Sequence, residues 1–244
     1  MIRAALLLCI VTTSVEAGVV YRFTTKYIGD RLRTASSGTV SVSGRSYRLV
    51  LDPDPSNPRA WDIAVSDGTE TRLINLGNQT WYRERAYPPG RETKLRGKVN
   101  ATRRSEGTES IDGRTAARHF LRLEYKQTED FGPTRVGSKV GVTLLVAAAA
   151  DLPPIPWQRH LTTGFREADG EIARFMETIE GMPLRTELAY TQTYEGGGIP
   201  STVVAMTTFT DISIEDVPPS RFEVPKGYRE QEPVIGVPGV TTRQ

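Results

Sequence analysis

The side chains that could carry acid–base chemistry in this chain are few, because it contains only two histidines, His119 and His160. Histidine is the side chain that most often transfers protons near neutral pH. Neither histidine lies in a motif typical of a serine hydrolase, a zinc peptidase or a phosphate-binding loop. His119 also falls on the apolar face of a predicted strand, which favours a structural role. An enzyme would have to use carboxylates alone, and we predict no catalytic residue.

Metal and thiol chemistry have equally few candidates. The only cysteine, Cys9, lies near the N-terminus in a segment that we expect to be removed. The acidic turn Asp52-x-Asp54-x-x-Asn57 offers oxygen ligands, but it lacks the glycine and the distal glutamate of an EF-hand. Turn formation explains these residues better. The sequence therefore predicts no metal site and no cofactor.

Residues 1–17 have the three parts of a secretory signal peptide. Arg3 supplies a positive charge, an apolar stretch of 8 residues runs from Ala4 to Val11, and Val15-Glu16-Ala17 ends in a small residue suited to cleavage. The apolar stretch is far shorter than the roughly 20 residues that span a bilayer. We expect cleavage near Ala17 and a mature protein that is located in the periplasm or secreted.

Charge argues against two classes of partner. The chain has 31 basic and 29 acidic residues, a net charge of +2, and both signs are interspersed along the sequence. A protein that binds nucleic acid or an anionic membrane normally concentrates basic residues in one region of the sequence. We expect no nucleic-acid partner and no electrostatic binding to an anionic membrane.

Alternation of apolar and polar residues dominates the chain from Gly18 onward, and this pattern predicts half-buried β-strands. In the first strand, Tyr21, Phe23 and Tyr27 alternate with charged or polar residues. Two short turns, Gly77-Asn78 and Asp112-Gly113, are typical of β-hairpins. The other segments with this alternation are 47–51, 61–65, 72–76, 79–85, 117–125, 140–146, 182–194 and 201–214.

The pattern changes to a helical one only between about residues 156 and 181. Ile172, Phe175, Met176 and Ile179 follow the spacing of an amphipathic helix, with Asp169 as the predicted N-cap and Gly181 as the C-terminal stop. A weaker helical pattern precedes it at Trp157, His160, Leu161 and Phe165. We predict a helical insert of two short helices.

These elements predict a mainly β fold, in which a curved antiparallel sheet forms an unclosed half-barrel covered by the short helical insert. No linker divides residues 18–228, so we expect one domain. Residues 229–244 are rich in proline, glycine and charge, which predicts a disordered tail.

The large apolar residues of these strands would lie on one face of the sheet, opposite those of the insert. That face could be a filled core, or it could be the wall of a cavity for an apolar ligand. The candidate ligand-binding residues are Tyr21, Phe23, Trp61, Trp81, Leu121, Leu123, Trp157 and Phe175.

Four stretches give the chain a resemblance to a known family. They are 108–114 (TESIDGR), 150–153 (ADLP), 181–185 (GMPLR) and 217–228 (VPPSRFEVPKGY). With these stretches the chain resembles the LolA/LolB-like superfamily of bacterial envelope proteins, whose members are similar to outer-membrane lipoprotein carriers. Within that superfamily it is most similar to a branch of unknown function. The resemblance implies an unclosed antiparallel barrel with a helical lid, here the segment from Trp157 to Ile179. It also implies an apolar cavity that carries lipids or lipoproteins.

Three functional hypotheses follow. The first is a non-catalytic, extracytoplasmic binding module for a lipid or another hydrophobic ligand. The alternative is an envelope structural or interaction protein that offers an exposed sheet edge to a partner protein. The third is an enzyme that uses paired carboxylates, which would have to lie together in a cleft.

Overall fold

The computed structural model describes residues 18–29, 35–54, 59–84, 94–131, 134–155, 163, 165–197 and 199–232. Within these ranges the chain forms a mainly β fold with one large sheet of 13 strands and one short α-helix. The helix is not long and apolar enough to cross a membrane.

The strands follow the alternating segments of the sequence. Nine of them form the main body of the sheet: β1 (Gly18–Gly29), β2 (Ala35–Ser43), β3 (Ser46–Leu51), β4 (Ile63–Ser66), β5 (Thr71–Asn75), β9 (Arg114–Phe131), β10 (Thr134–Ala149), β11 (Met182–Tyr194) and β12 (Ser201–Glu215). The remaining strands lie at its ends: β6 (Thr80–Arg83), β7 (Lys94–Leu95), β8 (Asn100–Ile111) and β13 (Arg229–Glu230).

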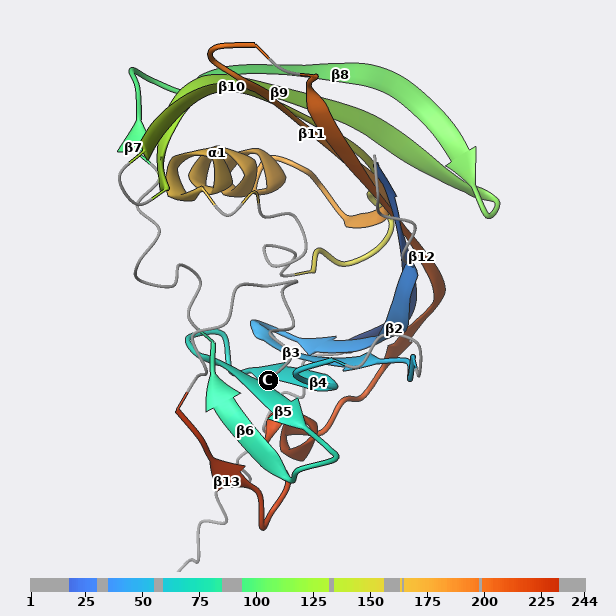
Figure 1. Cartoon of the computed structure of the whole chain (residues 1–244). Helices are drawn as coiled ribbons and strands as arrows, with labels where there is room; N and C mark the ends of the chain where they lie inside the picture. Colours follow the sequence, from blue (N-terminus) through green and yellow to red (C-terminus); the bar gives the residue numbers. More distant parts are fainter. Residues whose placement is uncertain are drawn as a thin grey trace, which may run out of the picture.

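The sheet joins two antiparallel meanders into one unclosed surface. Its order is β13-β6-β5-β4-β3-β2-β1-β12-β11-β10-β9-β7, and β8 also pairs with β9. The pairing of β1 with β12 connects the first meander to the second. The sheet bends into an open half-barrel, and the helix α1 (Arg166–Met176) lies on its concave side beneath β9 and β10 (Figure 1). The predicted fold class is confirmed.

The start of the helix differs from the prediction. It begins three residues before Asp169, so the prediction that Asp169 is the N-cap is wrong. The Asp169 carboxylate instead accepts hydrogen bonds from the backbone N–H (2.6 Å) and the hydroxyl (2.7 Å) of Thr163. Ala168 is fully buried and begins the apolar stripe that Ile172 and Phe175 continue. The hydrophobic pattern missed this first turn because alanine is small and only weakly apolar.

The end of the helix also differs, because α1 stops at Met176 rather than near Gly181. Thr178 closes the last turn by donating its hydroxyl hydrogen to the carbonyl of Phe175 (2.7 Å). Gly181 has a positive φ of 78°, and a Cβ there would overlap the backbone of Ala149. This glycine therefore permits a close contact between the start of β11 and the end of β10.

The two predicted hairpin turns have different outcomes. Asp112 and Gly113 form the whole connection between β8 and β9, and both have positive φ (48° and 76°), as a type I′ turn requires. The turn at Gly77-Asn78 is longer than predicted, because it spans residues 76–79 between β5 and β6. Its left-handed residue is Gln79, with φ 54°.

The C-terminal segment is ordered further than predicted. Arg229 and Glu230 form β13, which pairs in parallel with Thr80 and Trp81 of β6. The prediction of disorder from residue 229 is therefore wrong for these two residues. Residues 233–244 lie outside the described residues, as do the predicted leader (1–17) and most of the predicted first helix of the insert, including Trp157 and His160.

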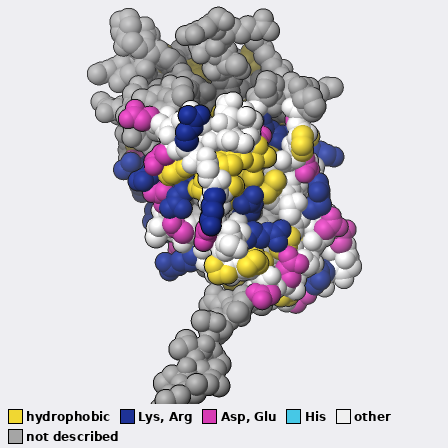
Figure 2. Space-filling view, turned by 90° about the horizontal axis from the view of Figure 1, so that it is seen from below, with side chains coloured by type: hydrophobic (Ala, Val, Ile, Leu, Met, Phe, Trp, Pro, Cys, Tyr) yellow, Lys and Arg dark blue, Asp and Glu magenta, His cyan; other side chains and the backbone are white. Residues whose placement is uncertain are grey.

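The sheet is buried on both faces in the region of β3 to β6. Leu49 and Leu73 belong to the core on the concave side, whereas Ile63, Val65 and Ile74 pack on the opposite side. Val224 and Tyr228 of the C-terminal segment pack partly over this second side. Seen from this end, apolar side chains lie among Lys, Arg, Asp and Glu (Figure 2). The C-terminal segment thus supplies the second layer that these strands need.

Two neighbouring leucines of β10 test which face of the sheet is the core. Leu144 is fully buried on the concave side, whereas Leu145 is half-buried on the outer side. We expect Leu144→Ala to lower the free energy of unfolding by about 2–5 kcal/mol, because it leaves a cavity in the core. Leu145→Ala should cost roughly 1 kcal/mol or less. Urea denaturation measures both values, and equal losses would contradict the assigned faces.

Candidate functional site

The candidate site is the concave face of the five strands β1, β12, β11, β10 and β9. Along each strand every second side chain points to this side, and the pairing register aligns them into rows. We call the apolar side chains around Tyr21, Phe23 and Phe209 the sheet cluster. Those around Leu121, Leu123 and Phe175 are the helix cluster. The face therefore divides into two apolar regions.

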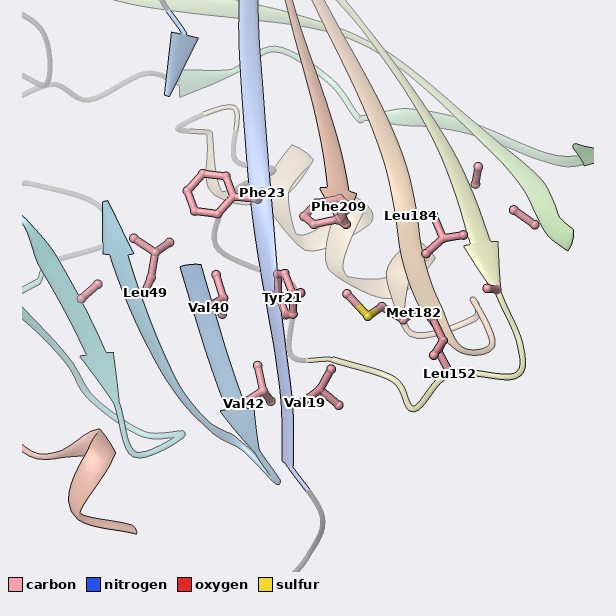
Figure 3. Packing of buried hydrophobic residues seen from close by; sticks show 14 of the residues in the cluster. Val19, Tyr21, Phe23, Val40, Val42, Leu49, Leu152, Met182, Leu184 and Phe209 are labelled. Carbon is pink, nitrogen blue, oxygen red and sulfur yellow. The ribbon is translucent and has the colours of Figure 1, made fainter. Parts of the chain in front are cut away.

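The sheet cluster contains three of the predicted residues. Tyr21 and Phe23 of β1 are buried with Val40, Leu49, Met182 and Phe209, and their side chains converge from different strands (Figure 3). The rings of Tyr21 and Phe209 meet edge to face with centroids 5.7 Å apart. Trp61 is half-buried at the margin of this cluster. Of the predicted residues, Trp61 is thus the one that remains partly accessible here.

Tyr21 places a hydroxyl inside the sheet cluster. Burial, and to a smaller extent the nearby Tyr47, raise the pKa of Tyr21 far above its usual range. Desolvation acts in this direction because it disfavours the charged phenolate. Tyr21 therefore remains neutral at all physiological pH values and acts as an aromatic core residue rather than an acid–base group.

The helix cluster contains three more of the predicted residues. Leu121 and Leu123 of β9 are fully buried beneath α1, which contributes Ile172 and Phe175. Phe165, just before the helix, stacks on Tyr125 of β9 with ring centroids 5.0 Å apart and an angle of 15°. The helix is thus held on β9 and β10 by contact with apolar side chains, as the prediction of a covering insert requires.

Trp81 does not belong to this face, and its prediction as part of the concave wall is wrong. It packs with Ile63, Val65 and Ile74 on the opposite side of the sheet. The guanidinium of Arg72 lies over its ring, 5.9 Å from the centroid. When both faces of a strand are covered, apolar residues occur at inward and outward positions alike. The alternation of apolar and polar residues then does not show on which face a tryptophan lies. Trp157, the eighth candidate, lies outside the described residues.

A row of three threonines separates the two apolar clusters. Thr25 of β1 lies opposite Thr207 of β12, which in turn lies opposite Thr186 of β11. All three are buried, and the hydroxyls of Thr25 and Thr207 form a hydrogen bond of 2.8 Å. The hydroxyl of Thr186 is fully buried and has no hydrogen-bond partner in the described part of the chain. We call these residues the threonine row.

The threonine row was not predicted from the sequence, because a threonine side chain is neither strongly apolar nor titratable near neutral pH. The signal was nevertheless present: Thr25 occupies an inward position between Phe23 and Tyr27, and Thr186 lies between Leu184 and Leu188. A threonine at an inward position of an apolar strand places a hydroxyl in the interior. The alignment of the three residues, however, depends on strand register.

A row of apolar side chains that is more exposed than the two clusters lies beside the helix cluster. It belongs to strands that the described helix does not cover. It consists of Tyr27, Val203, Ala205 and Tyr190, which are aligned by the pairing of β1, β12 and β11. Tyr27 is 37% exposed, and the other three are half-buried. We call these four residues the concave strip. It is an apolar and aromatic surface inside the half-barrel that the described residues leave partly accessible.

His119 lies on the concave side of β9, opposite the buried Val146 of β10, and is half-buried. Burial lowers the pKa of His119, and the nearby Glu180 acts in the opposite direction with a smaller effect. Asp112 and Asp151 share a surface pocket at the Asp112-Gly113 turn, where Arg114 forms an ion pair with Asp151 at 2.6 Å. Both carboxylates are exposed. The pocket thus contains an exposed ion pair between two turns.

The residues considered for metal binding are engaged in other contacts. The Asp52 carboxylate accepts hydrogen bonds from Arg22 (2.5 Å) and from Ser37 (2.7 Å). Asn57, the third residue of that turn motif, lies outside the described ranges. Among the described residues, no group of three or more His, Cys, Asp or Glu side chains could hold a metal ion.

Comparison with known proteins adds no family: no protein-family model matches the chain, and no curated protein matches it.

The threonine row allows a test in which two similar substitutions have opposite effects. Thr186→Val removes a buried hydroxyl without a partner, so we expect the free energy of unfolding to rise by about 1–3 kcal/mol. Thr207→Val leaves the Thr25 hydroxyl buried without its partner, so it should lower stability by about 1–3 kcal/mol. Urea denaturation of the two variants measures this contrast. Destabilisation by Thr186→Val would show that its hydroxyl is hydrogen-bonded.

Proposed function

We propose that this protein is a non-catalytic binding module for a lipid or another apolar ligand, and that it acts in the periplasm or outside the cell after cleavage near Ala17. The observation that carries the proposal is the concave strip, a partly accessible apolar surface inside an unclosed half-barrel. Sites for small apolar molecules are typically concave and lined by apolar and aromatic side chains with few polar groups. The concave strip and the clusters beside it have this composition.

The arrangement of the two clusters supports the proposal. The helix α1 covers β9 and β10, whereas the concave strip lies on β1, β11 and β12. A ligand on the strip would extend the apolar layer from the helix cluster toward the sheet cluster. Burial of apolar surface contributes about 25 cal/mol per Å², so an acyl chain seated there would be held mainly by the hydrophobic effect.

The threonine row supports a ligand that is apolar with a polar group. An ester or carboxyl group requires hydrogen-bond partners when it leaves water. Thr25, Thr207 and Thr186 place three hydroxyls between the two apolar clusters, and the Thr186 hydroxyl has no hydrogen-bond partner among the described residues. A lipid lying across the clusters would bring its polar group next to these hydroxyls.

The resemblance to the LolA/LolB-like superfamily points the same way. In that superfamily an unclosed antiparallel barrel with a helical lid encloses an apolar cavity. We propose that α1 is part of such a lid and that residues 18–228 form one domain of this kind. The proposal of export agrees with this resemblance, because apolar molecules need carriers in the aqueous space of the envelope.

The alternative function, an interaction protein that offers a sheet edge, depends on β8. This strand is 12 residues long and pairs with β9 alone among the described strands. Its register is interrupted between Ser105 and Thr108, and it carries Arg103, Arg104 and Glu106. Bulges and charges are features that protect an edge from pairing with another strand. We therefore favour ligand binding over partner binding through this edge.

Adjacent residues of β12 test the proposed ligand site. Ala205 points to the concave strip, whereas Val204 points to the outer face of the sheet. We expect Ala205→Trp to fill the strip and to weaken binding of the fluorescent apolar probe N-phenyl-1-naphthylamine by about ten-fold, or roughly 1.4 kcal/mol. Val204→Trp should leave probe binding unchanged.

Folding of both variants is checked by circular dichroism and thermal unfolding. If Ala205→Trp fails to fold, Val203→Phe on the same strip takes its place. Unchanged probe binding in a folded strip variant, or absence of probe binding by the unmodified protein, would contradict a ligand site on the concave strip.

A further inference from the structure

The outer face of the same sheet carries a second site. A groove of about 700 Å³ runs over β9, β10 and β11, next to the segment that leads from β7 to β8. Its side chains alternate with those of the concave face, so the sheet separates it from the concave strip. The volume lies in the range of small-molecule sites, roughly 300–1,000 Å³. We call it the basic groove.

The basic groove concentrates positive charge in a protein whose net charge is only +2. It is lined by five basic residues and one acidic residue: Arg96, Lys98, Arg122, Lys126, Lys139 and Glu124. Arg122 forms an ion pair with Glu124 (2.5 Å), and Arg96 forms one with Glu195 (2.6 Å). The three lysines form no ion pair with any described residue. Within the part of the chain that the structure describes, these three charges are therefore not neutralised by an ion pair.

Two of these lysines occupy an unfavourable arrangement. Lys126 of β9 and Lys139 of β10 lie directly opposite each other in the antiparallel register. Side chains in such positions are close neighbours, and like charges placed there destabilise the sheet. Other polar residues at these two exposed positions would avoid the repulsion between the two lysines. An anionic ligand between the two ammonium groups would offset this repulsion.

The floor of the groove suits a polar ligand. Gly141 lies between the basic residues, and a Cβ there would meet no atom within 4 Å, so its surface is open. Three threonines add hydroxyl groups: Thr143, Thr191 and Thr193. Small residues leave room for a ligand close to the backbone, and hydroxyls can donate hydrogen bonds to anionic oxygens.

We propose that the basic groove binds a ligand bearing phosphate groups, with Lys126 and Lys139 as its principal contacts. A phosphate group carries negative charge and oxygen atoms that accept charge-assisted hydrogen bonds from ammonium groups, and a ligand with two phosphates would match two adjacent lysines. The phosphate belongs either to a small soluble molecule or to a lipid headgroup. This inference does not depend on the proposed function, because the site lies on the opposite face of the sheet.

The test compares three substitutions of the same kind, each on the outer face of the sheet. Lys126→Gln and Lys139→Gln remove one charge from the groove, and Lys26→Gln on β1 removes one charge away from it. Titration calorimetry with inorganic pyrophosphate tests the soluble source. Sedimentation with vesicles of phosphatidylglycerol, compared with vesicles of phosphatidylcholine, tests the headgroup. Both are done at low ionic strength, because salt screens exposed charges.

We expect the unmodified protein and Lys26→Gln to bind the phosphate-bearing probe equally well. Lys126→Gln and Lys139→Gln should each bind it about ten-fold more weakly, because each variant loses one charge-assisted contact. Binding of pyrophosphate in this pattern assigns a soluble ligand, and binding of the phosphatidylglycerol vesicles alone assigns a headgroup. Lys126→Gln should also raise the urea midpoint of the free protein, because it removes the repulsion from Lys139. Absence of both kinds of binding, or an equal loss in Lys26→Gln, would overturn the proposal.

Discussion

The pairing of β1 with β12 is the interaction on which the rest of this structure depends. It extends from Gly18 opposite Glu215 to Gly29 opposite Val203 and joins residues that lie far apart in the sequence. Without it the chain would form two separate meanders, each with an exposed edge strand. With it, the twist of the strands accumulates over one continuous surface and produces the open half-barrel seen in Figure 1.

The features of both candidate sites follow from this pairing and from the registers beside it. The pairing aligns Thr25 with Thr207 and Tyr27 with Ala205, so the threonine row and the concave strip exist only in the joined sheet. On the outer face, the register of β9 with β10 places Lys126 opposite Lys139. One sheet thus has an apolar interior with a few hydroxyls and an outer groove in which two lysines lie opposite each other.

Much of the fold could be predicted from the sequence because its elements depend on local patterns. Alternation identified the strand that carries Tyr21 and Phe23, and Asp112-Gly113 marked a turn in which both residues must adopt positive φ. The errors have physical reasons. Ala168 is too small to reveal the first helical turn, and Gly181 is required by its contact with Ala149 rather than by the helix end. The prediction placed Trp81 on the wrong face of the sheet, because β6 is covered on both sides and alternation alone does not tell the two faces apart.

The sites were less predictable than the fold. Lys126 and Lys139 are 13 positions apart in the sequence, in strands rich in other charged residues, and their spacing gives no motif. Their significance appears only when register makes them neighbours. The same holds for Thr186, whose unpartnered hydroxyl depends on three strands and on the packing above them.

Native mass spectrometry of the protein purified from the cells that make it tests the central claim most directly, which is that the concave face holds an apolar ligand. The account predicts a bound species of defined mass in a one-to-one complex, recovered by organic extraction and identified as a lipid or another apolar molecule. A protein that carries only its own mass, together with an extract that contains no apolar molecule above the level of an unrelated control protein, would contradict it.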